Sequence, residues 1–112
     1  MAVEIWAYRE EFTDLDLGDF QVLATDGEIG KVDEATYETG NGLIIVDTGP
    51  WILGKKVMLP AGTIERIDLE DRAIYVDRTK EEIKAAPEFD PSGYADQEYR
   101  LRVGEYYSGL YS

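Results

Sequence analysis

The chain contains no cysteine and no histidine. Without cysteine, the fold can have neither disulfides nor thiolate metal ligands. Without histidine, it lacks the commonest general base, the commonest metal ligand and the usual pH switch near neutrality. These two absences argue against an enzyme, so we expect no catalytic residue, no metal site and no cofactor.

Long apolar runs are also missing. No stretch approaches the roughly 20 apolar residues that a membrane-spanning helix needs. The first residues, MAVEIWAYREEF, lack the basic region and apolar run of a secretory signal. We therefore expect a cytoplasmic protein that does not insert into a membrane.

Basic residues are scarce, because 11 Lys and Arg stand against 24 Asp and Glu, which gives a net charge of −13. Nucleic-acid binding draws much of its affinity from basic side chains that neutralise phosphates. Anionic membranes repel an acidic surface for the same reason. We expect no direct binding to nucleic acid. The charge either keeps the protein soluble or steers it toward a basic partner.

The 112 residues suit one domain. Six short segments alternate in polarity or are rich in β-branched residues, and turn residues separate them. This regular spacing is typical of a small barrel or sandwich, and a closed barrel leaves no exposed strand edge. The predicted fold is all-β, with strands over residues 20–25, 28–37, 43–48, 56–60, 63–68 and 72–77.

The first two predicted strands form a hairpin. Asp26-Gly27 is a dipeptide that favours a tight turn in which both residues have positive φ. In the return strand, Ile29 and Val32 fall on opposite faces. A bulge near Gly30 would bring both side chains inside, because glycine tolerates such a bulge.

The periodicity changes after the last predicted strand. Thr79 stands three residues before Glu82, which is the spacing of a capping box. Pro87 disfavours helix in the residue before it, so we predict a short helix over residues 79–86. The expected organisation is an N-terminal extension that packs on the barrel (1–19), the barrel domain (20–91) and an aromatic-rich C-terminal tail (92–112).

Residues 49–55, GPWILGK, have the spacing of a phosphate-binding loop. Such a loop needs backbone amides, but Pro50 offers none, and the next three residues are bulky. Lys56 stands where Ser or Thr would hold magnesium. The following VMLP predicts a strand, whereas a phosphate site needs the start of a helix. We therefore reject a nucleotide site.

Three segments together resemble the PRC-barrel domain family. They are ATDGEIGKVDEATY (24–37), VMLPAGTIERID (57–68) with the strand AIYVD after it, and TKEEIKAAPEFDP (79–91). Their hallmarks are an Asp-Gly turn before Ile-Gly-Lys-Val, a proline that closes the fourth strand, and a Thr-led helix that ends in Ala-Pro. The resemblance implies a small six-stranded β-barrel with a short helix after it.

The family includes the cytoplasmic part of the photosynthetic reaction-centre H subunit, the C-terminal domain of a ribosome-maturation factor, and many stand-alone bacterial proteins. This chain is similar to the stand-alone bacterial members. The resemblance implies a module that docks on other macromolecules. It implies no catalytic residues.

Two apolar and aromatic segments are candidate partner-binding surfaces. Residues 51–53 connect two predicted strands, so they either plug the end of the barrel or form an exposed patch. The tail alternates like a strand, yet Tyr99 and Val103 also have helical spacing. It either packs on its own barrel or crosses to a second subunit. The candidate residues are Trp51, Ile52, Leu53, Tyr106, Tyr107 and Tyr111.

Two clusters of carboxylates are interpreted as solvated turns. Neither has the twelve-residue calcium-binding pattern of an EF-hand, and a polar turn gives no reason for one carboxylate to differ chemically from the next. The clusters are Asp14, Asp16 and Asp19 in one segment and Asp68, Glu70 and Asp71 in another.

The sequence thus leads to two functional hypotheses. The first is a non-enzymatic protein-interaction or adaptor module that self-associates as a homodimer. The alternative is an accessory factor in RNA or ribosome metabolism. Because the chain is acidic, this factor would act through a basic protein partner and not through the RNA itself.

Overall fold

The structure is a computed structural model that describes residues 5–6, 17–36, 42–49, 56–87 and 97–111. All six predicted strands are present, and each end lies within one residue of its predicted position. The elements are β1 (Gln21–Ala24), β2 (Gly27–Thr36), β3 (Leu43–Asp47), β4 (Lys56–Pro60), the 3₁₀ turn η1 (Ala61–Thr63), β5 (Ile64–Asp68), β6 (Ala73–Val76), α1 (Lys80–Lys84) and α2 (Gln97–Gly109).

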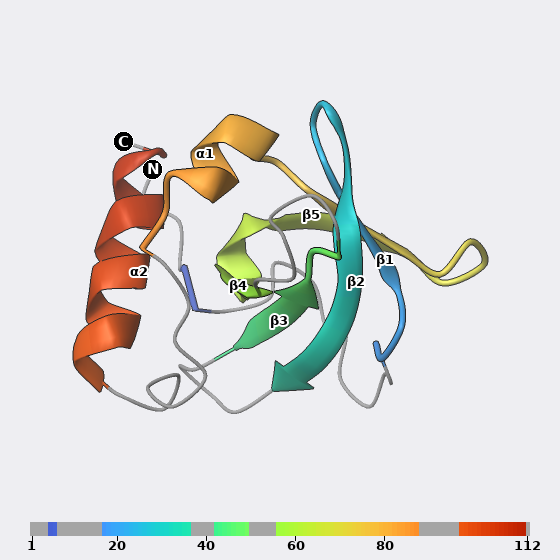
Figure 1. Cartoon of the computed structure of the whole chain (residues 1–112), viewed down its shortest axis with the longest axis horizontal. Helices are drawn as coiled ribbons and strands as arrows, with labels where there is room; N and C mark the ends of the chain where they lie inside the picture. Colours follow the sequence, from blue (N-terminus) through green and yellow to red (C-terminus); the bar gives the residue numbers. More distant parts are fainter. Residues whose placement is uncertain (1–4, 7–16, 37–41, 50–55, 88–96, 112) are drawn as a thin grey trace.

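The strands form one sheet in the order β4-β3-β2-β1-β6-β5. Neighbouring strands are antiparallel except β1 and β6, which are parallel. The sheet curls into a half-barrel around the apolar core (Figure 1). This confirms the predicted all-β, PRC-type fold. In the described part of the chain no ladder joins β4 to β5, so strand pairing does not close the sheet, and η1 connects these two edge strands.

The predicted bulge in β2 is present. Val22 pairs with Gly30 and Leu23 pairs with Glu28, so Ile29 is the extra residue. As a result, Ile29 and Val32 are 2% and 3% exposed and both lie in the core. A Cβ atom on Gly30 would lie 2.1 Å from the backbone oxygen of Asp47. Glycine therefore allows β2 to pass close to the end of β3.

The hairpin before this bulge was predicted correctly, but its turn residues were not. Ala24 pairs with Gly27, so the turn consists of Thr25 and Asp26, and Gly27 begins β2 with φ 141°. Asp26 does not have positive φ. Its side chain instead accepts a hydrogen bond from the backbone N–H of Lys80 at 2.9 Å. The turn is thereby attached to the first residue of α1.

Helix α1 begins with the predicted capping box. The Thr79 hydroxyl accepts from the Glu82 N–H, and the Glu82 carboxylate accepts from the Thr79 N–H. The helix ends at Lys84 and not at residue 86. The N–H of Ala85, its C-cap, donates to the carbonyl of Glu81. Ile83 turns inward and is buried in the core.

Residues 5–6 lie beside η1. The N–H of Gly62 donates to the Ile5 carbonyl at 2.7 Å, and the N–H of Gly42 donates to the Trp6 carbonyl at 2.9 Å. Ile5 is buried in the core. These contacts cover the side of the half-barrel where η1 connects β4 to β5.

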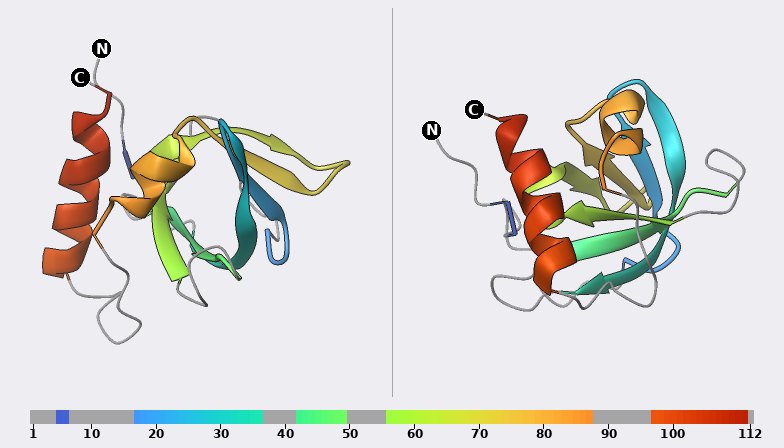
Figure 2. Two further views of the ribbon diagram at one scale, coloured as in Figure 1. Left: turned by 45° about the horizontal axis from the view of Figure 1, so that its top comes forward. Right: turned by 60° about the vertical axis from the view of Figure 1, so that its left-hand side comes forward.

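The tail forms helix α2. Of the two patterns in its sequence, the helical spacing of Tyr99 and Val103 therefore indicated the correct structure, and the strand-like alternation did not. The helix stands against β4 and near α1 (Figure 2). Tyr99, Val103 and Tyr107, each four residues apart, are buried in the core. Neither helix in the described residues has the length and apolarity needed to cross a membrane.

Candidate functional site

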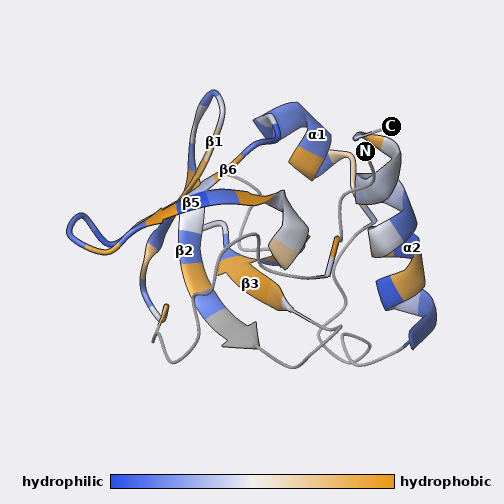
Figure 3. Cartoon of the chain, turned by 180° about the vertical axis from the view of Figure 1, so that it is seen from behind, coloured by the Kyte–Doolittle hydropathy of each residue, from blue (hydrophilic) through white to orange (hydrophobic). Residues whose placement is uncertain are grey.

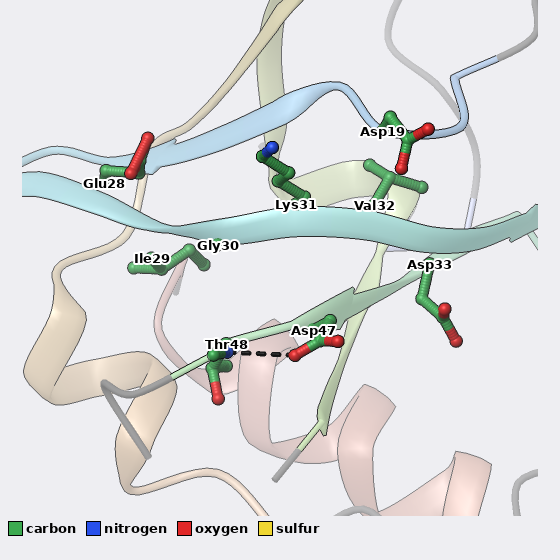
Figure 4. Close-up of a pocket in the computed structure, with 10 residues that line it drawn as sticks. Asp19, Glu28, Ile29, Gly30, Lys31, Val32, Asp33, Asp47 and Thr48 are labelled. Carbon is green, nitrogen blue, oxygen red and sulfur yellow. Dashed lines mark hydrogen bonds between the residues drawn. The ribbon is translucent and has the colours of Figure 1, made fainter. Parts of the chain in front are cut away.

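A groove of about 640 Å³ runs along β2, between the turn at residues 17–20 and the end of β3 (Figure 4). Its apolar part comes from the bulged segment of β2, and its polar part comes from charged side chains on both sides of that strand. The described residues that line it are Asp19, Glu28, Ile29, Gly30, Lys31, Val32, Asp33, Asp47, Thr48 and Gly49.

A second irregularity in β2 positions Asp33. Val32 pairs with Val46 and Glu34 pairs with Ile45, so Asp33 is an extra residue opposite β3. A bulge bends its strand and redirects side chains. The Asp33 carboxylate accepts a hydrogen bond from the Lys56 Nζ on β4 at 2.7 Å, and both side chains remain substantially exposed.

Asp19 and Asp47 come from the segments on either side of β2. The N–H of Asp19 donates to the Val32 carbonyl at 3.1 Å, and its φ of 65° is one that aspartate tolerates better than most residues. The Asp47 carboxylate accepts from the Gly49 N–H at 2.9 Å (Figure 4). These bonds fix the backbone of Asp19 and the carboxylate of Asp47 at the edge of the groove.

The charge of the groove is strongly one-sided. Asp19, Glu28, Asp33 and Asp47 line it with a single lysine, Lys31, and all five side chains are exposed. Asp33 is already paired with Lys56 on β4. Among the described residues, no three carboxylates come together as a metal site. The arrangement suits positively charged groups spread over an extended surface, such as the lysine and arginine side chains of a protein.

The tail tyrosines lie on the other side of the molecule. Tyr106 donates its hydroxyl hydrogen bond to the carbonyl of Glu82, and Tyr111 donates to the carboxylate of Asp77. The Arg78 guanidinium lies 4.4 Å from the centre of the Tyr111 ring. Tyr107 is fully buried, and its hydroxyl has no hydrogen-bond partner among the described residues. The tyrosines therefore attach α2 to α1 and to the core of the same chain.

Burial raises the pKa of two of these tyrosines. For Tyr107, burial is the main cause, and the nearby Tyr106 is the next largest; together they raise its pKa well above the ordinary value. For Tyr106, burial again comes first, and the carboxylate of Glu82 also raises the pKa. Both phenols consequently stay neutral at physiological pH.

A sequence model of the PRC-barrel domain matches residues 9–83, about two thirds of the chain. The protein belongs to the PRC-barrel domain family. The predicted resemblance is therefore confirmed. Helix α2 lies beyond the matched residues, so the PRC-barrel match ends before the part of the core that Tyr99, Val103 and Tyr107 supply.

Among solved structures, the PRC-barrel protein is similar to one from Pseudomonas aeruginosa described as a putative 16S ribosomal RNA processing protein, RimM. The TM-score is 0.50 and the sequence identity is 20%; the likeness covers 65% of this chain and 49% of that chain. This chain thus matches about half the length of that protein, and the likeness shows the fold alone. No curated protein matches the sequence.

The partner-binding residues predicted from the sequence are only partly described. Trp51, Ile52 and Leu53 lie outside the described residues. Of the tail residues, Tyr107 offers no surface, whereas Tyr106 and Tyr111 are partly exposed. The role expected of these six residues stays a prediction.

Sequence reasoning missed the groove of the PRC-barrel domain. It placed Asp19 in a solvated turn and did not single out Glu28, Asp33 or Asp47. The available signal was the bulge at Gly30, because bulges redirect side chains and concentrate near functional sites.

Proposed function

We propose that this PRC-barrel protein is a non-enzymatic interaction module that docks a basic protein along the acidic groove. The observation that carries the proposal is the set of four exposed carboxylates that line the groove, against Lys31 and the Lys56 that pairs with Asp33. The net charge of −13 adds long-range attraction for a basic partner. Phosphate groups of RNA would meet repulsion at the same surface.

Ile29 and Val32 line the floor of the groove, but they are only 2% and 3% exposed, so the charged rim carries most of its affinity. Basic side chains reach the carboxylates of that rim with the charged ends of long, flexible stems. A segment rich in lysine and arginine therefore complements the charge of the groove.

A second candidate function is an accessory role in ribosome maturation, through a basic ribosomal protein. The fold likeness to the protein described as RimM, together with the family assignment, favours it. The acidic groove is compatible with this role, because many ribosomal proteins are rich in lysine and arginine. The two candidate functions differ in the identity of the basic partner.

The groove can be tested with a charge-matched pair of variants. Asp19→Asn with Glu28→Gln removes two groove carboxylates, and Glu65→Gln with Glu81→Gln removes two exposed carboxylates elsewhere. Binding to individually purified small-subunit ribosomal proteins and to poly-L-lysine is measured by calorimetry at two salt concentrations. Each exposed ion pair contributes about 0.2–1 kcal/mol, so we expect the loss of two carboxylates to weaken binding by about two- to thirtyfold.

The control variant should stay within about twofold of wild type and keep its salt dependence. Equal weakening by both variants would show that net charge alone drives binding, which contradicts a groove site. Binding to poly-L-lysine without binding to any ribosomal protein would leave the first function standing and exclude the second.

Self-association is a further part of the proposal. Two copies would repel each other at the groove, so a homodimer would form elsewhere. Light scattering after size-exclusion chromatography of wild type and Trp51→Ala tests this. A truncation after residue 90 is unsuitable, because it removes Tyr99, Val103 and Tyr107 from the core. A monomeric wild-type protein at all concentrations would contradict the dimer.

A further inference from the structure

The hairpin between β5 and β6 extends beyond the body of the protein, on the side opposite α2 (Figure 1). Its tip is mostly hydrophilic with one apolar stretch (Figure 3). The apolar residue is Leu69, whose side chain is 56% exposed. In the described residues only Leu101, at 58%, is a comparably exposed large hydrophobic residue. Asp68, Glu70 and Asp71 surround Leu69 in the chain.

Hydrogen bonds hold the tip in one conformation. The N–H of Asp71 donates to the Asp68 carboxylate at 3.0 Å. Arg72 has a φ of 53°, in the left-handed region where such hairpin loops usually place glycine. Its guanidinium donates to the Gly18 carbonyl at 3.1 Å and lies 5.2 Å from the centre of the Phe20 ring. The side chain of Arg72 thus ties the root of the hairpin to the turn at residues 17–20.

The hairpin and the acidic groove share that turn. Gly18, which accepts the bond from Arg72, directly precedes Asp19, which lines the groove. The backbone of Gln21 also donates to the Arg72 carbonyl at 3.0 Å. The root of the hairpin therefore lies beside one end of the groove.

We propose that the hairpin tip is an apolar anchor, and that Leu69 inserts into an apolar pocket with a basic rim on the protein that occupies the groove. The inference rests on the proposed function and adds a second contact with the same partner. A second copy of this chain is a poor occupant, because its acidic surface would face the carboxylates around Leu69. A tip already fixed by Asp68 and Arg72 loses little freedom on binding, which favours affinity.

The test compares two leucines of equal exposure. Leu69→Ser removes the anchor, and Leu101→Ser makes the same change on the outer face of α2. Binding is measured with the small-subunit ribosomal protein that binds wild type most tightly, and with poly-L-lysine, which offers charge without a pocket. Urea unfolding confirms that both variants are folded.

We expect Leu69→Ser to weaken binding of the folded ribosomal protein at least tenfold, which is about 1.4 kcal/mol. Its salt dependence and its affinity for poly-L-lysine should equal those of wild type. Leu101→Ser should bind as wild type does.

Unchanged affinity of Leu69→Ser, alongside weaker binding of the Asp19→Asn and Glu28→Gln variant, would overturn the anchor and leave the groove function intact. Equal losses for both leucine variants would also overturn it. If no ribosomal protein binds wild type, both the anchor and the ribosomal candidate fail.

Discussion

The buried hydroxyl of Tyr107 gives the sharpest test of how the core is built. The side chain is fully buried, and within the described part of the chain its hydroxyl has no hydrogen-bond partner. In the unfolded chain, water satisfies that hydroxyl. Folding therefore removes a hydrogen bond without replacing it, which costs about 1–3 kcal/mol. Tyr107→Phe keeps the ring and removes this cost.

The magnitude follows from two opposing contributions. Loss of one oxygen atom leaves a small cavity, which destabilises by a few tenths of a kcal/mol at about 24 cal/mol per Å³. The net expectation is a gain of about 1 kcal/mol in the free energy of unfolding. With a slope of about 2 kcal/mol per molar urea, the urea midpoint should rise by about 0.5 M.

Alkaline pH provides an independent readout. Burial raises the pKa of Tyr107 in the folded protein, whereas the unfolded value is about 10. Below pH 10 the phenol is protonated in both states. Above it, only the unfolded state releases the proton, so stability falls by about 1.4 kcal/mol per pH unit. Tyr107→Phe should lose stability less steeply than wild type from about pH 10 upward.

Tyr106 supplies a control, because its substitution should change the free energy of unfolding in the opposite direction. Tyr106 donates its hydroxyl to the Glu82 carbonyl, so Tyr106→Phe should destabilise by about 0.5–1.5 kcal/mol. If Tyr107→Phe also destabilises by 1 kcal/mol or more, and its alkaline profile matches wild type, the Tyr107 hydroxyl has a partner in solution and the reasoning is wrong.

Three glycines give further predictions. Gly30→Ala places a Cβ 2.1 Å from the Asp47 backbone oxygen, so we expect a loss of about 2–4 kcal/mol in urea unfolding; a loss below about 1 kcal/mol would refute the close approach of the strands. Gly104→Ala places a Cβ 3.0 Å from the Trp6 indole nitrogen, whereas Gly109 has open space around it. Gly109→Ala should keep or raise stability, while Gly104→Ala should lower it and shift the tryptophan emission; equal effects would contradict the packing of Trp6 on α2.

The strands could be predicted from the sequence because their information is local. Short β-branched or alternating segments between turn residues gave each boundary to within one residue. The bulge could be predicted because Ile29 and Val32 fall on opposite faces of a regular strand. The extra residue of a bulge allows both side chains to point into the core. The hairpin turn was assigned one residue too late, because Gly27 pairs with Ala24 and already belongs to β2.

The tail could not be assigned from the sequence because Tyr99 and Val103 fit two periodicities. Burial of Tyr107 at the next helical position decides in favour of the helix. The groove was missed for a related reason. Its carboxylates come from three separate segments, and two bulges in β2 bring them together. Neither effect is visible in sequence spacing.

The core also explains which surfaces are available for binding. Helix α2 lies outside the PRC-barrel match, yet Tyr99, Val103 and Tyr107 complete the core beside β4. Most of the described aromatic residues of the tail are used in packing, and the exposed large hydrophobic residue on that side is Leu101. The opposite side carries the groove and the Leu69 hairpin, which no described helix covers (Figure 1). Charged groove residues and an exposed leucine thus occur together on the opposite side, and the proposed partner must match both.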